Sequence, residues 1–314
     1  MIEGEDLQLF ERSLRNATEQ HTGEALDAAL AEMGWRDALS FDMRAAVSCL
    51  FELQGEFGAT SSALDHVVAL AVGHELDGTT GVALPAIGAD EPPGCRDGDH
   101  ISVRGLATAT KPSMLVVARD GDKHVAARVD TSALDVRSVA GVDPRFGLVE
   151  LHGDVRADGA QPAEWLDALL LAQLAVGHEL VGASRKALAL AREHALERVQ
   201  FGQPIARFQA VRHRLAEALV AIETASAVLE AAWLDQSPVI AAMAKATAGR
   251  SGRTVARHCQ QVLAGVGFTT EHDLHRYVRR ILLLDQLFGS HTVLTKRLGE
   301  DLLTTRTLPR LPPL

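Results

Sequence analysis

The sequence predicts an α+β fold that is mainly α. It has a shortened helical domain at the N-terminus, a small β-domain and a C-terminal four-helix bundle. Hydrophobic residues make up 47% of the chain but aromatic residues only 4%, so Ala, Leu and Val must fill a core of packed helices. Hydrophobic periodicity is helical at both ends of the chain and gives way to short β-branched runs between them. We place the domains at 1–74, 75–158 and 159–314.

The first domain is expected to hold three or four helices. Its clearest pattern runs from Phe41 to Phe57, where the glycines near the end weaken the helix. Residues 60–62, Thr-Ser-Ser, offer N-caps for a further helix with Asp65 in its first turn.

The middle domain is predicted by clustered turn-forming residues and short strands. Residues 113–119 and 124–129 form a hairpin pattern around an Asp-Gly turn at 120–122. Five or six short strands in 75–158 suggest a compact sheet or small barrel.

The last domain begins with a helical period of more than thirty residues, from Leu166 to Ala195, in which Gly177 allows close approach of a neighbour. Two helices are expected at 208–233 and from Pro238 to about 263, since proline suits a first helical turn. A fourth runs over about 271–303, with an interruption at Gly289.

Composition excludes several classes of function. The formal net charge of −10 argues against nucleic acid as the main partner. The three cysteines are far apart and lack metal-ligand or disulfide spacing. The acidic N-terminus has no apolar signal core and no apolar run nears about 20 residues, so we expect a cytoplasmic protein with no membrane partner.

Two breaks between helices carry the motifs. The first reads Glu-Arg-Val-Gln-Phe-Gly-Gln-Pro-Ile at 197–205, followed by Phe-Gln-Ala-Val at 208–211. It leaves Arg198 and Gln200 at a helix end, where guanidinium can make bidentate bonds to phosphate oxygens. The second is Gln-Val-Leu-Ala-Gly-Val-Gly-Phe at 261–268.

Together these segments resemble the flavin-dependent acyl-CoA dehydrogenases, over about residues 177–289. In that family both turns reach across a dimer interface to the partner's FAD. The resemblance implies that Arg198 contacts the FAD pyrophosphate, Gln200 hydrogen-bonds nearby and Phe201 packs beside the adenosine. The alternative for the arginine is an ion pair with Glu193 or Glu197 on its own helix end.

The second motif is similar to the family's Gln, two apolar residues, Gly-Gly-X-Gly-Phe. This similarity implies that Gln261 and Gly265 meet the same FAD. Ala264 replaces the first glycine and narrows the approach. Gly265 and Gly267 also fit an ordinary helix C-cap.

The catalytic carboxylate of the family has no counterpart at its usual places. The family's glutamate precedes a Gly-Thr/Ser pair, and Phe288 stands at that position before Gly289 and Ser290. Some members use a glutamate early on the long helix instead, a place that falls near Ala172. Glu179, two turns further along, is the nearest carboxylate, although a packing or interface role is the stronger expectation.

Other family elements are missing as well. Residues 83–95 occupy the place of the flavin-facing Thr-Glu-Pro…Gly-Ser-Asp string without matching it, and no Trp-Ile-Thr/Ser element follows. A basic cluster begins the last helix at His272, His275, Arg276, Arg279 and Arg280. We expect it to be a solvated or phosphate-facing surface, because no third and fourth ligand completes a metal site.

The resemblance therefore implies a subunit of a heteromeric FAD-dependent acyl-CoA dehydrogenase that lacks the base and completes the partner's FAD site. The expected partners are a catalytic subunit in an α2β2 tetramer, an acyl-CoA substrate and an electron acceptor. By analogy, the substrate is a bulky thioester such as a steroid side-chain CoA. The alternatives are a self-sufficient homo-oligomeric dehydrogenase with an unconventional base, and a flavin-free helical scaffold.

Overall fold

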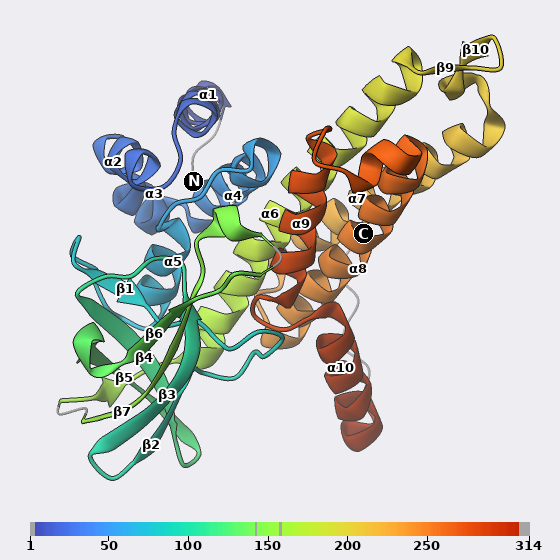
Figure 1. Cartoon of the computed structure of the whole chain (residues 1–314). Helices are drawn as coiled ribbons and strands as arrows, with labels where there is room; N and C mark the ends of the chain where they lie inside the picture. The colour runs from blue at the N-terminus through green and yellow to red at the C-terminus, as the bar shows by residue number, and fades with distance from the viewer. Residues whose placement is uncertain (1–3, 142, 157–158, 308–314) are drawn as a thin grey trace.

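The computed structural model describes residues 4–141, 143–156 and 159–307. Along the sequence, helices precede and follow one β-region. In space this region lies beside the first helices and the start of the long central helix (Figure 1). This is the mainly helical α+β arrangement predicted from the hydrophobic periodicity.

Five helices form the N-terminal region. Their bounds are α1 Gly4–Gln20, α2 Glu24–Glu32, α3 Trp35–Phe41, α4 Met43–Phe57 and α5 Ala63–Ala71. The predicted helix 41–57 is split at Asp42, whose side chain accepts a hydrogen bond from the Ala45 N–H at 3.0 Å and so caps α4.

The β-region is a sheet with more strands than the sequence suggested. Its strands are β1 Thr80–Val82, β2 Gly94–Asp97, β3 His100–Ala107, β4 Ser113–Asp120, β5 Lys123–Asp130, β6 Asp135–Ser138, β7 Val149–Arg156 and β8 Gln161–Pro162. They are ordered β6-β7-β3-β2-β4-β5-β8, with β1 parallel to β4. The predicted hairpin is β4–β5, in which Asp120 pairs with Lys123 around Gly121 at φ 60°.

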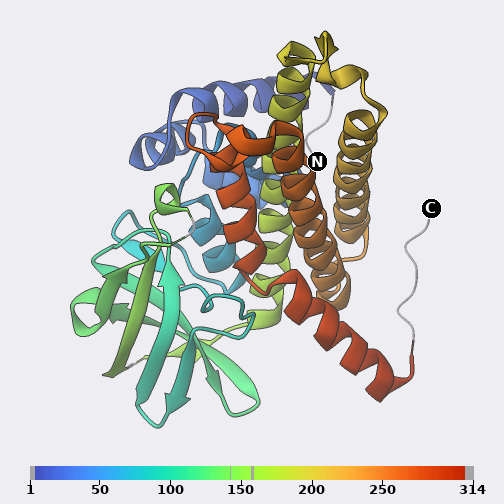
Figure 2. The ribbon, with the colours of Figure 1, turned by 45° about the vertical axis from the view of Figure 1, so that its right-hand side comes forward.

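The C-terminal helices pack around α6, Trp165–Glu197. The other elements are β9 Val199–Gln200, β10 Gln203–Pro204, α7 Gln209–Leu234, α8 Pro238–Leu263, α9 Leu274–Gln286 and α10 His291–Thr305. The break before α10 falls at Gly289, as predicted. In both views α10 extends away from the other helices (Figures 1 and 2).

Small residues let α6 sit at the centre of the core. A Cβ at Gly182 would overlap the backbone oxygen of Glu52 on α4, and one at Gly177 would lie 2.6 Å from Leu229 on α7. Among the described helices only α6 is long and apolar enough to cross a membrane, and its most apolar window is 78% buried. That burial is the environment of a core helix.

Candidate functional site

The charged turn at 198–205 is a hairpin at the tip of the C-terminal helices (Figure 1). α6 ends at Glu197, and β9 and β10 pair through Gln200 and Gln203. Phe201 and Gly202 in the loop both have positive φ, of 54° and 76°, as in a type I′ turn. A phenylalanine in that conformation is unusual, which makes the turn a specified feature.

The side chains of this hairpin face solvent. Arg198 is exposed and forms no ion pair among the described residues, so the alternative pairing with Glu193 or Glu197 is not formed. Gln200 is exposed, and its side-chain amide donates to the adjacent carbonyl of Val199 at 2.8 Å. The Phe201 ring is 93% exposed and meets Phe208 edge-on. The hairpin therefore presents a guanidinium, an amide and an aromatic ring to any molecule that covers it.

The second motif lies at the same end of the bundle. Gln261 is exposed on the last turn of α8, and a short 3₁₀ helix, η4 Ala264–Phe268, follows. His194 on α6 contacts the His272 ring edge-on at 5.9 Å, which ties this region to the first turn. No atom lies within 4 Å of a Cβ built on Gly265, so a ligand can approach its backbone.

Ala264 adopts a conformation that suits glycine. Its φ is 52° and its ψ is −130°, a region that the Cβ of an L-residue makes costly. This residue is the C-cap of α8, in place of the cap at Gly265 and Gly267 that the sequence allowed. Ala264 stands where the resembled motif has its first glycine, and its backbone is therefore strained.

Both expected positions of the catalytic carboxylate are filled with buried apolar side chains. Phe288 is 1% exposed in the loop between α9 and α10, and Ala172 is fully buried on α6. The two segments meet, because the Gln173 amide donates to the Phe288 carbonyl at 3.1 Å. Neither position can take a proton.

The loop that carries Phe288 is held from α8. The ammonium of Lys245, fully buried, donates to the carbonyls of Asp285 at 3.1 Å and Gly289 at 3.2 Å. Asp285 in turn accepts from Arg253 at 2.5 Å and from the His291 N–H at 3.0 Å. Burial lowers the pKa of Lys245 to about 8, an effect partly offset by the Asp285 carboxylate.

Glu179 is engaged in a buried ion pair. Its carboxylate, 2% exposed, accepts from Arg280 Nε at 2.7 Å. Burial raises the pKa of Glu179, while the guanidinium acts in the opposite direction. Arg280 also bonds to the Ala59 carbonyl and lies 4.3 Å over the Phe146 ring. These contacts join α6 and α9 to the segments at Ala59 and Phe146, as expected of residues that hold packed elements together.

The position of Arg280 corrects one expectation from the sequence. The basic cluster was expected on a solvated surface, yet Arg280 is 2% exposed. His272 and His275 satisfy local backbone groups, including a 2.8 Å contact from His275 Nδ1 to the His272 carbonyl. Among the described residues no group of three His, Cys, Asp or Glu could hold a metal ion.

The segment in place of the flavin-facing strand is a packed connection. It carries no hydroxyl side chain between Ala83 and Asp90, and Leu84 is 1% exposed. Asp90 pairs with Arg297 of α10 at 2.5 Å, while its carbonyl accepts from the Trp165 indole at 3.2 Å. The segment therefore bonds to the C-terminal helices instead of offering hydroxyl groups to a ligand.

A buried carboxylate joins the first helices to the sheet. Asp65 on α5 accepts from the Val82 N–H at 3.2 Å and from the Thr108 hydroxyl at 3.3 Å. Burial raises the pKa of Asp65 to about 7. Next to this junction lies a cavity of about 400 Å³, lined by Thr108, Phe146 and Glu179 among others.

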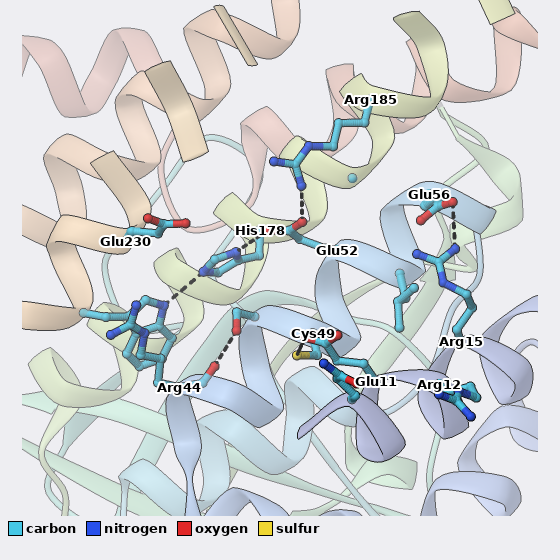
Figure 3. Close-up of a pocket in the computed structure, with 15 residues that line it drawn as sticks. Glu11, Arg12, Arg15, Arg44, Cys49, Glu52, Glu56, His178, Arg185 and Glu230 are labelled. Atoms are coloured by element: carbon cyan, nitrogen blue, oxygen red, sulfur yellow. Dashed lines mark hydrogen bonds and ion pairs between the residues drawn. The ribbon is translucent and has the colours of Figure 1, made fainter. Parts of the chain in front are cut away.

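A second cavity, of about 610 Å³, lies between α1, α4, α6 and α7 (Figure 3). The Trp233 indole donates to His178 Nε2 at 3.0 Å, so His178 carries its proton on Nδ1 and donates to Glu52 at 3.1 Å. Glu52 also pairs with Arg185 at 2.5 Å. Both imidazole nitrogens are occupied, so His178 is not a free base.

Comparison with known proteins gives a consistent assignment. Residues 165–303 match the family model described as the acyl-CoA dehydrogenase C-terminal domain. The chain is 30% identical to acyl-CoA dehydrogenase IpdE2 of Mycobacterium tuberculosis over 96% of its own length and 98% of that protein's.

Two solved structures share the fold over nearly the whole chain. One is the Tcur3481–Tcur3483 steroid ACAD, with a TM-score of 0.79, 22% identity, and coverage of 96% of this chain and 99% of the other. The second is the ChsE4–ChsE5 complex of Mycobacterium tuberculosis, with a TM-score of 0.77, 20% identity, and coverage of 98% and 99%.

Proposed function

Because the chain belongs to the acyl-CoA dehydrogenase family of oxidoreductases, we propose that it is the flavin-completing subunit of a heteromeric acyl-CoA dehydrogenase. In this role it supplies no catalytic base and covers the FAD of a catalytic partner. The observation that carries the proposal is the burial of Phe288 and Ala172 at both carboxylate positions. α-Proton abstraction needs a positioned base, so that step belongs to the partner subunit.

The residues at the bundle tip fit an FAD held mainly elsewhere. When bound, FAD supplies the acceptor for the hydride that leaves the β-carbon of the acyl-CoA. Arg198 would pair with its pyrophosphate and Gln200 would hydrogen-bond beside it, because both side chains are exposed and Arg198 has no ion-pair partner among the described residues. Phe201 would pack against the adenosine, while Gln261 and Gly265 would approach from η4.

The comparisons support a proposal for the assembly and for the substrate. The ChsE4–ChsE5 structure is a complex, and the Tcur3481–Tcur3483 protein is a steroid ACAD. We infer an α2β2 heterotetramer that acts on a bulky acyl-CoA, such as a steroid side-chain thioester, and passes electrons to a separate acceptor protein.

A self-sufficient enzyme with an unconventional base is the second candidate, and Glu179 is the first candidate for that base. Glu179 lines the 400 Å³ cavity, which favours this alternative. Its ion pair with Arg280 opposes it, because proton uptake would leave a buried guanidinium with Asp143, at 3.6 Å, as its one remaining charged partner among the described residues. A flavin-free scaffold is the third candidate.

Flavin occupancy tests the proposal. The chain purified alone should be colourless, and co-expression with an adjacent dehydrogenase subunit should give about one flavin for every two chains. Arg198→Ala should lower FAD retention in the complex and leave assembly intact, as read by the visible spectrum and gel filtration. Arg192→Ala, an exposed arginine earlier on α6, is the matched control. Unchanged flavin occupancy in Arg198→Ala would remove the assigned role. A yellow protein alone would favour the second candidate, and a stable complex without flavin the third.

A further inference from the structure

A basic groove of about 390 Å³ runs between α8 and α9, which pack side by side (Figures 1 and 2). Three arginines of α8 line it: Arg250, Arg253 and Arg257. Their spacing of three and four residues places them on one helix face. His291, the first residue of α10, closes one side.

The three arginines of this groove differ in how their charge is compensated. Arg253 is compensated, because its Nε lies 2.5 Å from the buried carboxylate of Asp285. Arg250 and Arg257 are exposed and have no ion-pair partner in the part of the chain that the structure describes. The whole chain carries a formal charge of −10, so this cationic face is a local exception.

The groove also has an apolar component and a defined end. Leu282 of α9 is partly exposed and contributes apolar surface, whereas Val278 behind it is 6% exposed. Gln260 lies at the far end, next to Gln261 of the second motif. Beyond it, Val266 and Phe268 are 37% and 71% exposed. The groove is therefore continuous with the end of α8 that we propose meets the partner's FAD.

We propose that this groove receives an acidic segment of the catalytic partner subunit, with carboxylates on Arg250 and Arg257 and an apolar side chain over Leu282. This rests on the heteromeric function proposed above. The two arginines lie seven residues apart, about 10 Å along the helix axis. Two carboxylates on one extended or helical segment can pair with both guanidinium groups along that span. A small anion would leave the adjoining exposed side chains of Val266 and Phe268 uncovered.

Affinity between the purified subunits tests the proposal, measured by titration at about 50 mM and about 500 mM salt. The variant Arg250→Glu/Arg257→Glu should bind the partner at least about ten-fold more weakly at low salt. The difference should shrink at high salt, because the attraction is electrostatic. The matched control is Arg12→Glu/Arg44→Glu, two exposed arginines of α1 and α4, with an equal change of net charge and wild-type affinity expected.

A second variant guards against misfolding and identifies the occupant. Arg257→Lys preserves the charge and provides an amine that carbodiimide can join to a carboxylate in contact. Peptide mapping of the complex should find the cross-link in an Asp- or Glu-rich segment of the partner.

Each outcome decides between the two proposals. A wild-type complex that carries flavin, with equal affinity for the reversed variant or no cross-link, overturns the groove assignment and leaves the proposed function standing. Arginine-dependent stabilisation of the isolated chain by inorganic phosphate, with unchanged subunit affinity, also overturns it in favour of a small-anion site. A wild-type chain that does not join the partner overturns both.

Discussion

Replacing Ala264 by glycine should stabilise the protein, which is the reverse of the usual effect of this substitution. Its φ of 52° and ψ of −130° lie where glycine is free and alanine is not. A residue held in such a region costs about 1–3 kcal/mol. Glycine also raises the conformational entropy of the unfolded chain, which offsets about 0.4–1 kcal/mol of the stability gained by relieving the strain. The net gain for Ala264→Gly is therefore roughly 0.5–2 kcal/mol.

The free energy of unfolding from urea denaturation, followed by circular dichroism, measures this difference. Ala216→Gly supplies the matched control, because Ala216 is exposed in the interior of α7 with ordinary helical geometry. There the same chemical change should lower stability by about 1 kcal/mol. Changes of opposite sign in the free energy of unfolding at the two sites would support backbone strain at Ala264. A similar loss at both would refute it, since position 264 would then behave as ordinary helix.

Two further predictions concern buried carboxylates. Glu179→Gln should leave turnover of the assembled complex nearly unchanged, because the carboxylate pairs with Arg280 and, in the proposed function, does not act on the substrate. A loss of several orders of magnitude in kcat would make Glu179 the base. For Asp65, the folded-state pKa of about 7 exceeds the unfolded value of 3.8, so the native state retains a proton that the unfolded state has released. Stability should therefore fall with rising pH by up to about 1.4 kcal/mol per unit between these values and then level off. Asp65→Asn should abolish that slope in urea titrations at several pH values, and an equal slope in the variant would assign the titration to another group.

Local sequence patterns predicted the helical part of the fold well. Pro238 marked the start of α8, and the structure adds an N-cap there, since the Ser237 hydroxyl accepts from the Ile240 N–H at 3.3 Å. The apolar period of α6 and the glycine at 289 set the limits of two further elements. Helix starts and ends depend on residues that are neighbours in the sequence, so local sequence patterns can predict them.

The parts that were missed depend on contacts across long sequence separations. β8 is short, and both of its residues are exposed, so it lacks an alternating pattern to detect. The partner of Glu179 is 101 residues away and that of His178 is 126 residues away. Arg280 looked like one member of a basic helix surface, because nothing nearby in the sequence shows that it points inward to a carboxylate.

Phe288 and Ala172 fill the two expected positions of the carboxylate, and several contacts around Phe288 support the proposal that this chain supplies no base. A carboxylate at position 288 would lie in a loop whose native side chain is 1% exposed, where ionisation is costly. Lys245 holds that loop through two carbonyls, while Asp285 is committed to Arg253 and His291. The hairpin of Arg198 remains exposed and without an ion pair among the described residues. Buried apolar side chains at both carboxylate positions, together with an exposed charged hairpin, favour the proposal of an FAD seated in another subunit over that of a displaced catalytic residue.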